Sequence, residues 1–150
     1  INIASSAGRL GILRSQEKVD LFTNPNLTLD QLDGYMNDFV KAAENGKHEE
    51  WAGTCYGMSK LGIIAMTKIL ARDYNHNNNN SSSSDAGADD SRSSSLLLVN
   101  SVDPGYCATD QNNNQGTRPA ERGATTPYLL ATTSEDFSGM HWFDERVIAW

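Results

Sequence analysis

A strand–helix–strand pattern is the feature of this sequence that most constrains its fold. Residues 1–4 alternate apolar and polar side chains and run into a Ser-Ser-Ala-Gly turn, which predicts a strand. Residues 96–99 are uninterrupted Leu and Val, which indicates a second strand that is covered on both faces in a parallel sheet and ends in Asp103-Pro104-Gly105. Between them, residues 56–74 carry apolar side chains at helical spacing. We therefore predict an α/β fold with a right-handed crossover.

A second amphipathic helix is predicted over residues 29–43, where apolar side chains recur on one face. Thr28 and Gln31 have the spacing of a capping box, in which each side chain accepts a hydrogen bond from the other residue's backbone N–H. Asn45 and Gly46 follow the last apolar residue and provide a stop signal. The sequence therefore predicts both ends of this helix.

A third helix is predicted to begin at Pro119 and to end near residue 132. Proline suits the first turn of a helix because the backbone N–H that it lacks would have no partner there. Pro127 lies inside this segment and is expected to kink or interrupt the helix. The tail, residues 143–150, is too short for an assignment.

Residues 77–95 form a low-complexity tract in which 12 of 19 positions are Asn or Ser. Its largest apolar side chain is Ala, so the tract cannot bury enough surface to offset the entropy of ordering. We predict a disordered surface loop that is an inert expansion, although self-association of the Asn-rich stretch is an alternative.

The charge pattern argues against a polyanionic partner. The chain has 12 basic and 19 acidic side chains, a net charge of −7, and its basic residues are scattered. No apolar run approaches the roughly 20 residues of a membrane span. Cys55 and Cys107 match neither a disulfide framework nor a metal-ligand spacing, and His48, His76 and His141 suggest no metal site. We expect no nucleic acid, membrane or metal partner, and the cytoplasm as the compartment.

Tyr56 and Lys60 are the most informative pair of polar residues. Their i, i+4 spacing places both on one face of a helix. Tyrosine is a weak acid, and a neighbouring ammonium group favours the phenolate, so Lys60 is expected to make Tyr56 a better proton donor. Ser6, at the end of the first strand, is placed to hydrogen bond to the same carbonyl oxygen. Taken alone, Tyr56 is equally an aromatic residue at a helix start.

The order of these features resembles the short-chain dehydrogenase/reductase family. Its catalytic half has a strand ending in a serine pair, a Tyr-x-x-x-Lys helix, and a strand followed by Pro-Gly-x-x-x-Thr. The resemblance implies catalysis by the second serine of the pair, the tyrosine and the lysine, and it implies that the lysine holds the nicotinamide ribose while the Pro-Gly segment contacts the nicotinamide and nearby phosphates. The implied catalytic residues are Ser6, Tyr56 and Lys60; the implied cofactor-binding residues are Tyr56, Lys60, Pro104, Gly105 and Thr109, and Tyr106 borders the substrate pocket.

The spacing narrows the resemblance to the carbonyl reductase branch. Ser6 and Tyr56 are 50 positions apart, and the helix over residues 29–43 occupies the interval. That branch carries such an extra helix, a Trp shortly before the active-site Tyr, and a final Arg-Val-x-x-Trp, which match Trp51 and residues 146–150. The resemblance implies a monomer that uses NADPH to reduce quinones, aldehydes and ketones.

The cofactor-binding motifs of the family do not occur in this sequence. The Thr-Gly-x-x-x-Gly-x-Gly phosphate cradle and the Asn-Asn-Ala-Gly motif are absent, and Gly8 and Gly11 are loop glycines. Residues 1–150 are therefore expected to be the catalytic half of one domain, the C-terminal part of a doubly wound parallel-sheet Rossmann fold whose N-terminal cofactor half is missing. The strands present would leave a sheet edge unpaired, so the isolated chain is expected to be unstable.

Two functions follow from this sequence. The first is NADPH-dependent carbonyl reduction by an intact parent protein, with this chain inactive on its own. The alternative is a catalytically inactive remnant that acts, if at all, by binding another protein. The physiological substrate, the stereochemistry, and the choice of NADPH over NADH are not written in the residues present, because the selecting residues of the family lie in the missing half.

Overall fold

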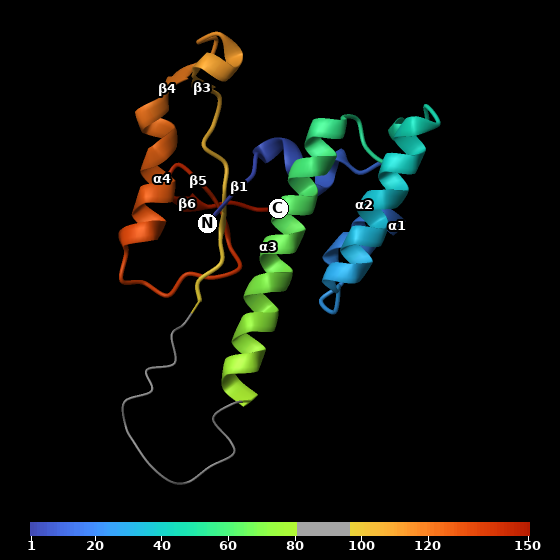
Figure 1. Ribbon diagram of the computed structural model, residues 1–150, viewed down its shortest axis with the longest axis horizontal. Coiled ribbons are helices and arrows are strands. Elements are labelled where there is room, and N and C mark those ends of the chain that lie inside the picture. The colour runs from blue at the N-terminus through green and yellow to red at the C-terminus, as the bar shows by residue number, and fades with distance from the viewer. Residues whose placement is uncertain (81–96) are drawn as a thin grey trace.

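The computed structural model describes residues 1–80 and 97–150 and contains a four-stranded sheet in the order β1-β2-β5-β6 (Figure 1). The first three strands are parallel and the last is antiparallel to its neighbour. The predicted α/β class with a parallel sheet is therefore confirmed. The strands are β1 (Asn2–Ile3), β2 (Ser101–Val102), β5 (His141–Phe143) and β6 (Arg146–Val147), and a separate parallel pair consists of β3 (Cys107–Ala108) and β4 (Arg118–Pro119).

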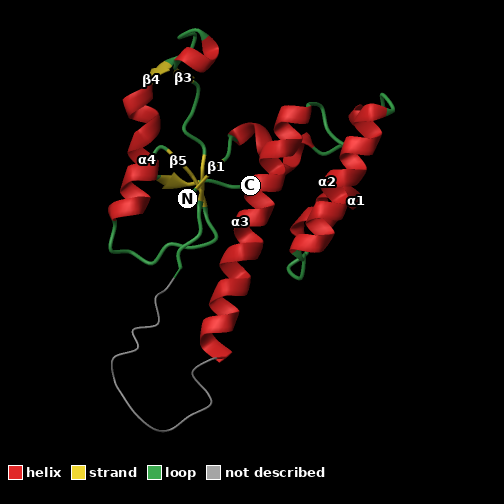
Figure 2. Cartoon of the chain, viewed as in Figure 1, coloured by secondary structure: helices red, strands yellow, loops and turns green. Residues whose placement is uncertain are grey.

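Helices lie on both sides of the sheet, with α3 on one side and α4 on the other (Figure 2). The connection from β1 to β2 passes through α3, which is the predicted crossover between parallel strands. Helices α1 and α2 lie against α3 on the side away from the sheet. The helices are α1 (Gln16–Thr23), α2 (Leu29–Glu44), α3 (Cys55–Asn80) and α4 (Ala120–Thr132).

Helix α2 begins and ends where the sequence predicts. The backbone N–H of Gln31 donates to Thr28 Oγ1 at 3.2 Å, and that of Thr28 donates to Gln31 Oε1 at 3.1 Å, so the capping box is complete. The chain leaves the helix through Gly46, whose φ of 72° lies in the left-handed region that favours glycine. Helix α1 was not predicted; Ser15 caps it by accepting a hydrogen bond from the Lys18 backbone N–H.

The main apolar core lies among α1, α2 and α3. Met58 and Leu61 are completely buried on the face of α3 that meets α2, and Phe39 of α2 packs its ring against Trp51 with 6.4 Å between the ring centroids. The sheet edge is less protected, because β1 pairs only with β2 and Ile3 is 47% exposed. The helical layer is therefore the best-packed part of the described chain.

Two boundaries differ from the predictions. The strand predicted to start at the apolar run of residues 96–99 and to end at Asp103 is shorter in the structure, where β2 covers only Ser101 and Val102 and Leu97 is 48% exposed. Helix α3 continues to Asn80, four residues into the Asn/Ser tract, since extending an existing helix adds one hydrogen bond per residue. Residues 81–95 of that tract lie outside the described residues. Within the described range no helix is long and apolar enough to cross a membrane.

Helix α4 runs through Pro127 without a break, so the expected interruption is wrong. Proline deprives the Gly123 carbonyl of its usual helical donor. The helix nevertheless persists because its buried side, which includes Gly123 and Thr126, packs against the segment after β2 and the β5–β6 turn. Tertiary packing here outweighs the local preference of proline.

Candidate active site

Three chain segments converge at the carboxyl ends of β1 and β2. One is the segment that follows β1, the second is the first turns of α3, and the third is the loop after β2. Together with α4 they enclose a cavity of about 680 Å³. Six of the seven predicted site residues line this one cavity: Tyr56, Lys60, Pro104, Gly105, Tyr106 and Thr109.

Tyr56 and Lys60 lie on one face of α3, as their spacing predicts. The Lys60 ammonium group is 5.6 Å from the centroid of the Tyr56 ring, and it donates a hydrogen bond to the Ile3 carbonyl oxygen at 3.3 Å. Tyr56 is 59% exposed, so its phenol is accessible from the cavity side. A cation within about 6 Å of an aromatic ring is attracted to it, and the pair therefore holds together without a ligand.

Close packing sets the position of α3 beneath the loop after β1. A Cβ atom on Gly8 would lie 2.5 Å from the backbone carbon of Lys60, and one on Gly57 would lie 2.7 Å from the Ala7 carbonyl oxygen. Neither distance is possible for real atoms, so any larger side chain would push the loop and helix apart. The two glycines therefore let the serine loop lie directly on the helix that carries Tyr56 and Lys60.

The two serines after β1, Ser5 and Ser6, make different contacts. Ser5 caps a short 3₁₀ helix, η1 (Ser6–Gly8), by accepting a hydrogen bond from the Ala7 backbone N–H at 3.2 Å. Ser6 is exposed, and its backbone N–H donates to Asp103 Oδ2 at 2.7 Å. Ser6 does not line the cavity, although Ala4 in the same segment does. The structure thus brings Ser6 to the edge of the site, and its catalytic role stays a prediction.

The loop after β2 is shaped by backbone-directed hydrogen bonds. Gly105 has a φ of 77°, and its backbone N–H donates to Asp103 Oδ1 at 2.8 Å. The Cys107 thiol donates to the Pro104 carbonyl oxygen at 3.2 Å. Thr109 begins the turn η4 (Asp110–Asn112) and its backbone N–H donates to the side chain of Asn112. These bonds present Pro104, Gly105 and Thr109 along one wall of the cavity.

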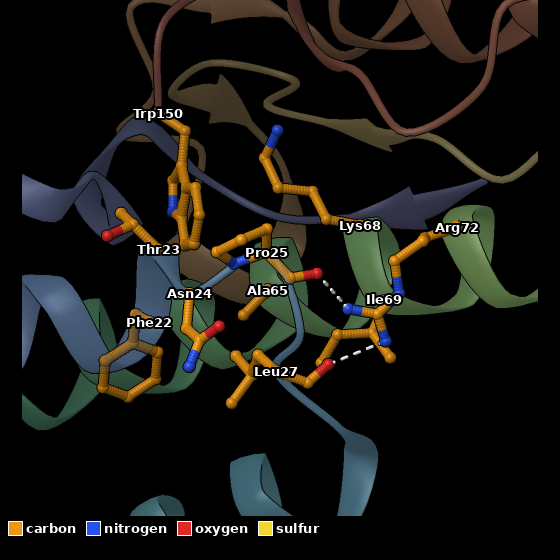
Figure 3. A pocket seen from close by; sticks show the side chains of 10 residues that line it. All are labelled: Phe22, Thr23, Asn24, Pro25, Leu27, Ala65, Lys68, Ile69, Arg72 and Trp150. Carbon is orange, nitrogen blue, oxygen red and sulfur yellow. Dashed lines mark hydrogen bonds between the residues drawn. The ribbon is translucent and has the colours of Figure 1, made fainter.

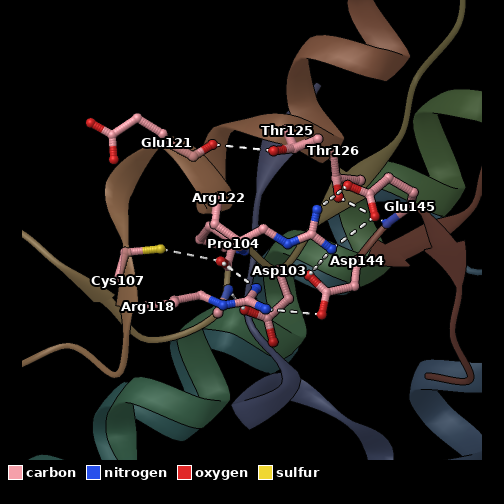
Figure 4. A network of polar contacts seen from close by, with 11 residues as sticks. Asp103, Pro104, Cys107, Arg118, Glu121, Arg122, Thr125, Thr126, Asp144 and Glu145 are labelled. Carbon is pink, nitrogen blue, oxygen red and sulfur yellow. Dashed lines mark hydrogen bonds and ion pairs between the residues drawn. The ribbon is translucent and has the colours of Figure 1, made fainter.

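A network of charged side chains ties this loop to the β5–β6 turn (Figure 4). The Arg118 guanidinium donates to the Pro104 carbonyl oxygen at 3.3 Å and to Asp144 Oδ2 at 2.9 Å. Arg122 forms a two-pronged pair with Glu145, at 2.7 and 3.0 Å, and also contacts Asp144. The hydrogen bond from Arg118 lowers the pKa of Asp144, which keeps this carboxylate ionised.

The sequence interpretation missed Asp103, Arg118 and the contribution of α4 to the cavity. Asp103 directly precedes the Pro-Gly pair, and that position was the only signal in the sequence. Arg118 gave no signal, because its partners are a backbone carbonyl 14 positions away and a carboxylate 26 positions away. Helix α4 supplies Ala120, Gly123, Ala124 and Pro127 to the lining.

A second cavity, of about 400 Å³, lies between α1 and α3 under Trp150 (Figure 3). The Arg72 guanidinium donates to the carbonyl oxygens of Pro25 and Leu27 at 2.6 and 2.8 Å, which closes one side. Burial lowers the pKa of Lys68, whose ammonium group lies over the Trp150 ring. This cavity shares no lining residue with the one at Tyr56, and it holds no acid–base pair on which chemistry could be built.

The described residues contain no group of three or more His, Cys, Asp or Glu side chains that could hold a metal ion. The polar side chains at the Tyr56 cavity are instead two phenols, an ammonium group, a hydroxyl group, a thiol and two amides. Such a set can donate hydrogen bonds and protons to an oxygen atom, which is the chemistry required for carbonyl reduction.

No model of a known protein family matches the chain. Comparison with individual proteins nevertheless finds relatives along most of its length. Carbonyl reductase [NADPH] 1 of Sus scrofa is 29% identical over 100% of this chain and 49% of its own length. Carbonyl reductase [NADPH] 3 of Mus musculus is 33% identical over 94% of this chain and 47% of its own length. The chain therefore spans about half the length of the curated relatives it matches.

Among solved structures, salutaridine reductase from Papaver somniferum superposes with a TM-score of 0.73 and 23% identity, over 94% of this chain and 43% of that one. This likeness gives the fold, which is that of a short-chain dehydrogenase/reductase, and its partial coverage agrees with a C-terminal part of that fold. The relatives named carbonyl reductase, together with this fold, confirm the resemblance to this family. The chain is similar to carbonyl reductases 1 and 3, whose names carry the expected cofactor, NADPH.

Proposed function

We propose that this chain is the catalytic half of an NADPH-dependent carbonyl reductase, which reduces quinones, aldehydes or ketones to alcohols. The observation that carries the proposal is the single cavity onto which Tyr56, Lys60 and the loop from Pro104 to Thr109 all open. Relatives named for this activity, along nearly the whole chain, support it. The active enzyme in this proposal is a longer parent protein, and this chain alone is inactive.

In this proposal, each residue of the site has a different role at the carbonyl group of the substrate. NADPH, when bound, supplies the hydride that the carbonyl carbon receives. Tyr56 donates the proton to the oxygen, because its phenol is exposed toward the cavity at the start of α3. The Lys60 ammonium group lies 5.6 Å from the centroid of the Tyr56 ring, next to the residue from which the proton leaves. Ser6, the first residue of η1 after β1, donates a hydrogen bond to the same oxygen in this proposal.

The cavity suits the nicotinamide end of this cofactor. Its volume of about 680 Å³ falls within the roughly 300–1,000 Å³ of small-molecule sites. In this proposal, Lys60 holds the ribose hydroxyls, and Pro104, Gly105 and Thr109 contact the nicotinamide and adjacent phosphates, as the resemblance implies. Glycine is required at position 105, because φ lies at 77° and a Cβ atom there would lie 2.7 Å from Arg118 Nη1. Tyr106, 54% exposed, borders the substrate.

Three further parts of the proposal rest on the resemblance. Residues 1–150 make up part of one Rossmann domain, and the adenine half of the cofactor is held by residues outside this chain. The protein is a monomer, with α2 covering the surface that other members of the family use to pair. It resides in the cytoplasm, which agrees with the free thiols of Cys55 and Cys107.

The test is NADPH oxidation with a simple quinone by the full-length protein, compared with Tyr56→Phe. Removal of the phenol hydroxyl should lower kcat by about 100- to 10,000-fold, the usual contribution of a general acid. Tyr128→Phe is the matched control, since Tyr128 is 70% exposed on α4 and does not line the cavity. Equal activity of the two variants would refute the assignment of Tyr56.

A non-catalytic protein-binding module is the second candidate. It is favoured by one observation, the unpaired edge of β1 with Ile1 and Ile3 each 47% exposed, onto which a strand of another protein could add. The two candidates separate in the same experiment. A full-length protein that binds NADPH but reduces no quinone, aldehyde or ketone would support the binding module.

A further inference from the structure

Asp103 links the two loops that carry the proposed site. It follows β2 directly, and only 5% of its surface is exposed. Its Oδ2 atom accepts a hydrogen bond from the Ser6 backbone N–H at 2.7 Å, and its Oδ1 atom accepts one from the Gly105 backbone N–H at 2.8 Å. One carboxylate therefore bridges the serine loop after β1 and the Pro-Gly loop after β2.

The backbone of Asp103 is itself held in the sheet. Its N–H donates to the Trp142 carbonyl oxygen of β5 at 2.8 Å, and the preceding residue, Val102, is completely buried. The carboxylate thus projects from a strand end that is hydrogen bonded to β5 and lies between the two loops. Residues supported by strands hold functional groups more firmly than residues on loops do.

The chemistry of both bonds requires a carboxylate. Each oxygen of an ionised aspartate accepts hydrogen bonds, whereas an asparagine has one accepting oxygen and one NH₂ group that only donates. An asparagine at position 103 would therefore face either the Ser6 or the Gly105 N–H with another donor. Bonds from N–H groups to a carboxylate are also shorter and stronger than those between neutral groups.

We infer that Asp103 is a positioning residue. By accepting hydrogen bonds from the backbone N–H groups of Ser6 and Gly105, it fixes the Ser6 hydroxyl relative to the side of the cavity at Gly105, where the cofactor is proposed to bind. The inference rests on the proposed carbonyl reduction and adds a residue that acts through Ser6 and Gly105 without touching the substrate. A displacement of about 1 Å at a reacting group can lower a rate about 100-fold. The carboxylate thus sets kcat more than substrate affinity.

The experiment compares Asp103→Asn with wild type in the full-length protein, using quinone reduction by NADPH, thermal unfolding and amide hydrogen exchange. We expect kcat to fall about 100-fold while KM for the quinone changes little and the melting temperature stays within a few degrees. The Ser6 and Gly105 amide protons should exchange faster. Asp136→Asn is the control, because Asp136 is exposed and lies between α4 and β5, away from the cavity lining.

A chemical rescue separates positioning from general damage. Asp103→Ala leaves room for a small carboxylate, so sodium formate should recover about tenfold of the lost kcat, whereas sodium chloride at equal ionic strength should not. Retention of kcat within about twofold in Asp103→Asn would overturn the inference. So would unfolding of that variant, which would assign the carboxylate to the fold.

The experiment still tests the role of Asp103 if the proposed function fails. Absence of turnover in wild type would refute carbonyl reduction but would leave the amide exchange rates as the measure of positioning. Faster exchange at both Ser6 and Gly105 in Asp103→Asn supports the bridge. Unchanged exchange at either amide overturns it.

Discussion

The helical layer and the loop layer of this chain are held together by different forces. Helices α1, α2 and α3 share an apolar core that contains Phe22, Phe39 and Leu61. The loop from residue 103 to 119, in contrast, is held by hydrogen bonds and ion pairs, many of which end on backbone atoms. Apolar burial is non-directional and sums over many contacts, whereas each polar bond fixes one atom. We therefore expect mutations in the first layer to change stability, and mutations in the second to change catalysis.

The largest effect on stability is expected in the helical layer. Phe39→Ala should lower the free energy of unfolding by about 3–5 kcal/mol, because the side chain is 5% exposed and packs against Trp51. The value of kcat, measured below the melting temperature, should stay near wild type. Val40→Ala is the control on the same helix, since Val40 is 49% exposed and its loss should cost under about 1 kcal/mol. A similar loss in both variants would contradict the proposed core.

A smaller effect, of opposite character, is expected from Arg118→Met. The loss of its bonds to the Pro104 carbonyl oxygen and to Asp144 frees the Pro-Gly loop, so KM for NADPH should rise about tenfold. The melting temperature should change little, because a partly exposed ion pair contributes little to stability. Arg146→Met is the control. Arg146 lies on the exposed strand β6, next to the turn that carries Asp144, and its replacement should leave both KM and the melting temperature unchanged. A drop in stability with no change in KM would reverse the distinction between the layers.

The same distinction explains what could be predicted from the sequence. The α2 boundaries are local: Thr28, Gln31 and Gly46 lie within the helix ends, and all three act as predicted. Tyr56 and Lys60 share a helix, so their placement on one face followed from spacing alone. The bond between Ser6 and Asp103 spans 97 positions, and no local pattern encodes it. Helix α1 has no local sequence pattern either, because its eight residues lack a clear apolar stripe.

Errors in the strands have a related cause. The apolar run at residues 96–99 indicated the start of a buried strand that ends at Asp103, but only Ser101 and Val102 pair with β1 as a strand. The extent of β2 was thus set by its pairing with β1, and the sequence did not define how far β1 extends. The short β5 and β6 were missed because their turn uses Asp144 and Glu145 in the left-handed region, where glycine or asparagine is the usual signal.

The smallest effect is expected in the sheet itself, at the buried His141 of β5. Its Nδ1 atom is 2.9 Å from Ser101 Oγ, and its Nε2 atom is buried without a hydrogen-bond partner among the described residues. Burial lowers the pKa of His141 below its usual value near 6.5, against the opposing attraction of Asp103.

The sign of the pH dependence follows from this lowered pKa. Above about pH 6.5 the imidazole is neutral in both folded and unfolded chains, and the stability is at its full value. As the pH falls below 6.5, the unfolded chain gains a proton that the folded chain does not, so the free energy of unfolding decreases until the pH passes the folded pKa. Melting temperatures of the full-length protein between pH 7.5 and 5.5 measure this, with His141→Gln as reference. The wild type should lose more stability than the variant over this range, and parallel curves would show that the pKa of His141 is the same in the folded and unfolded chains.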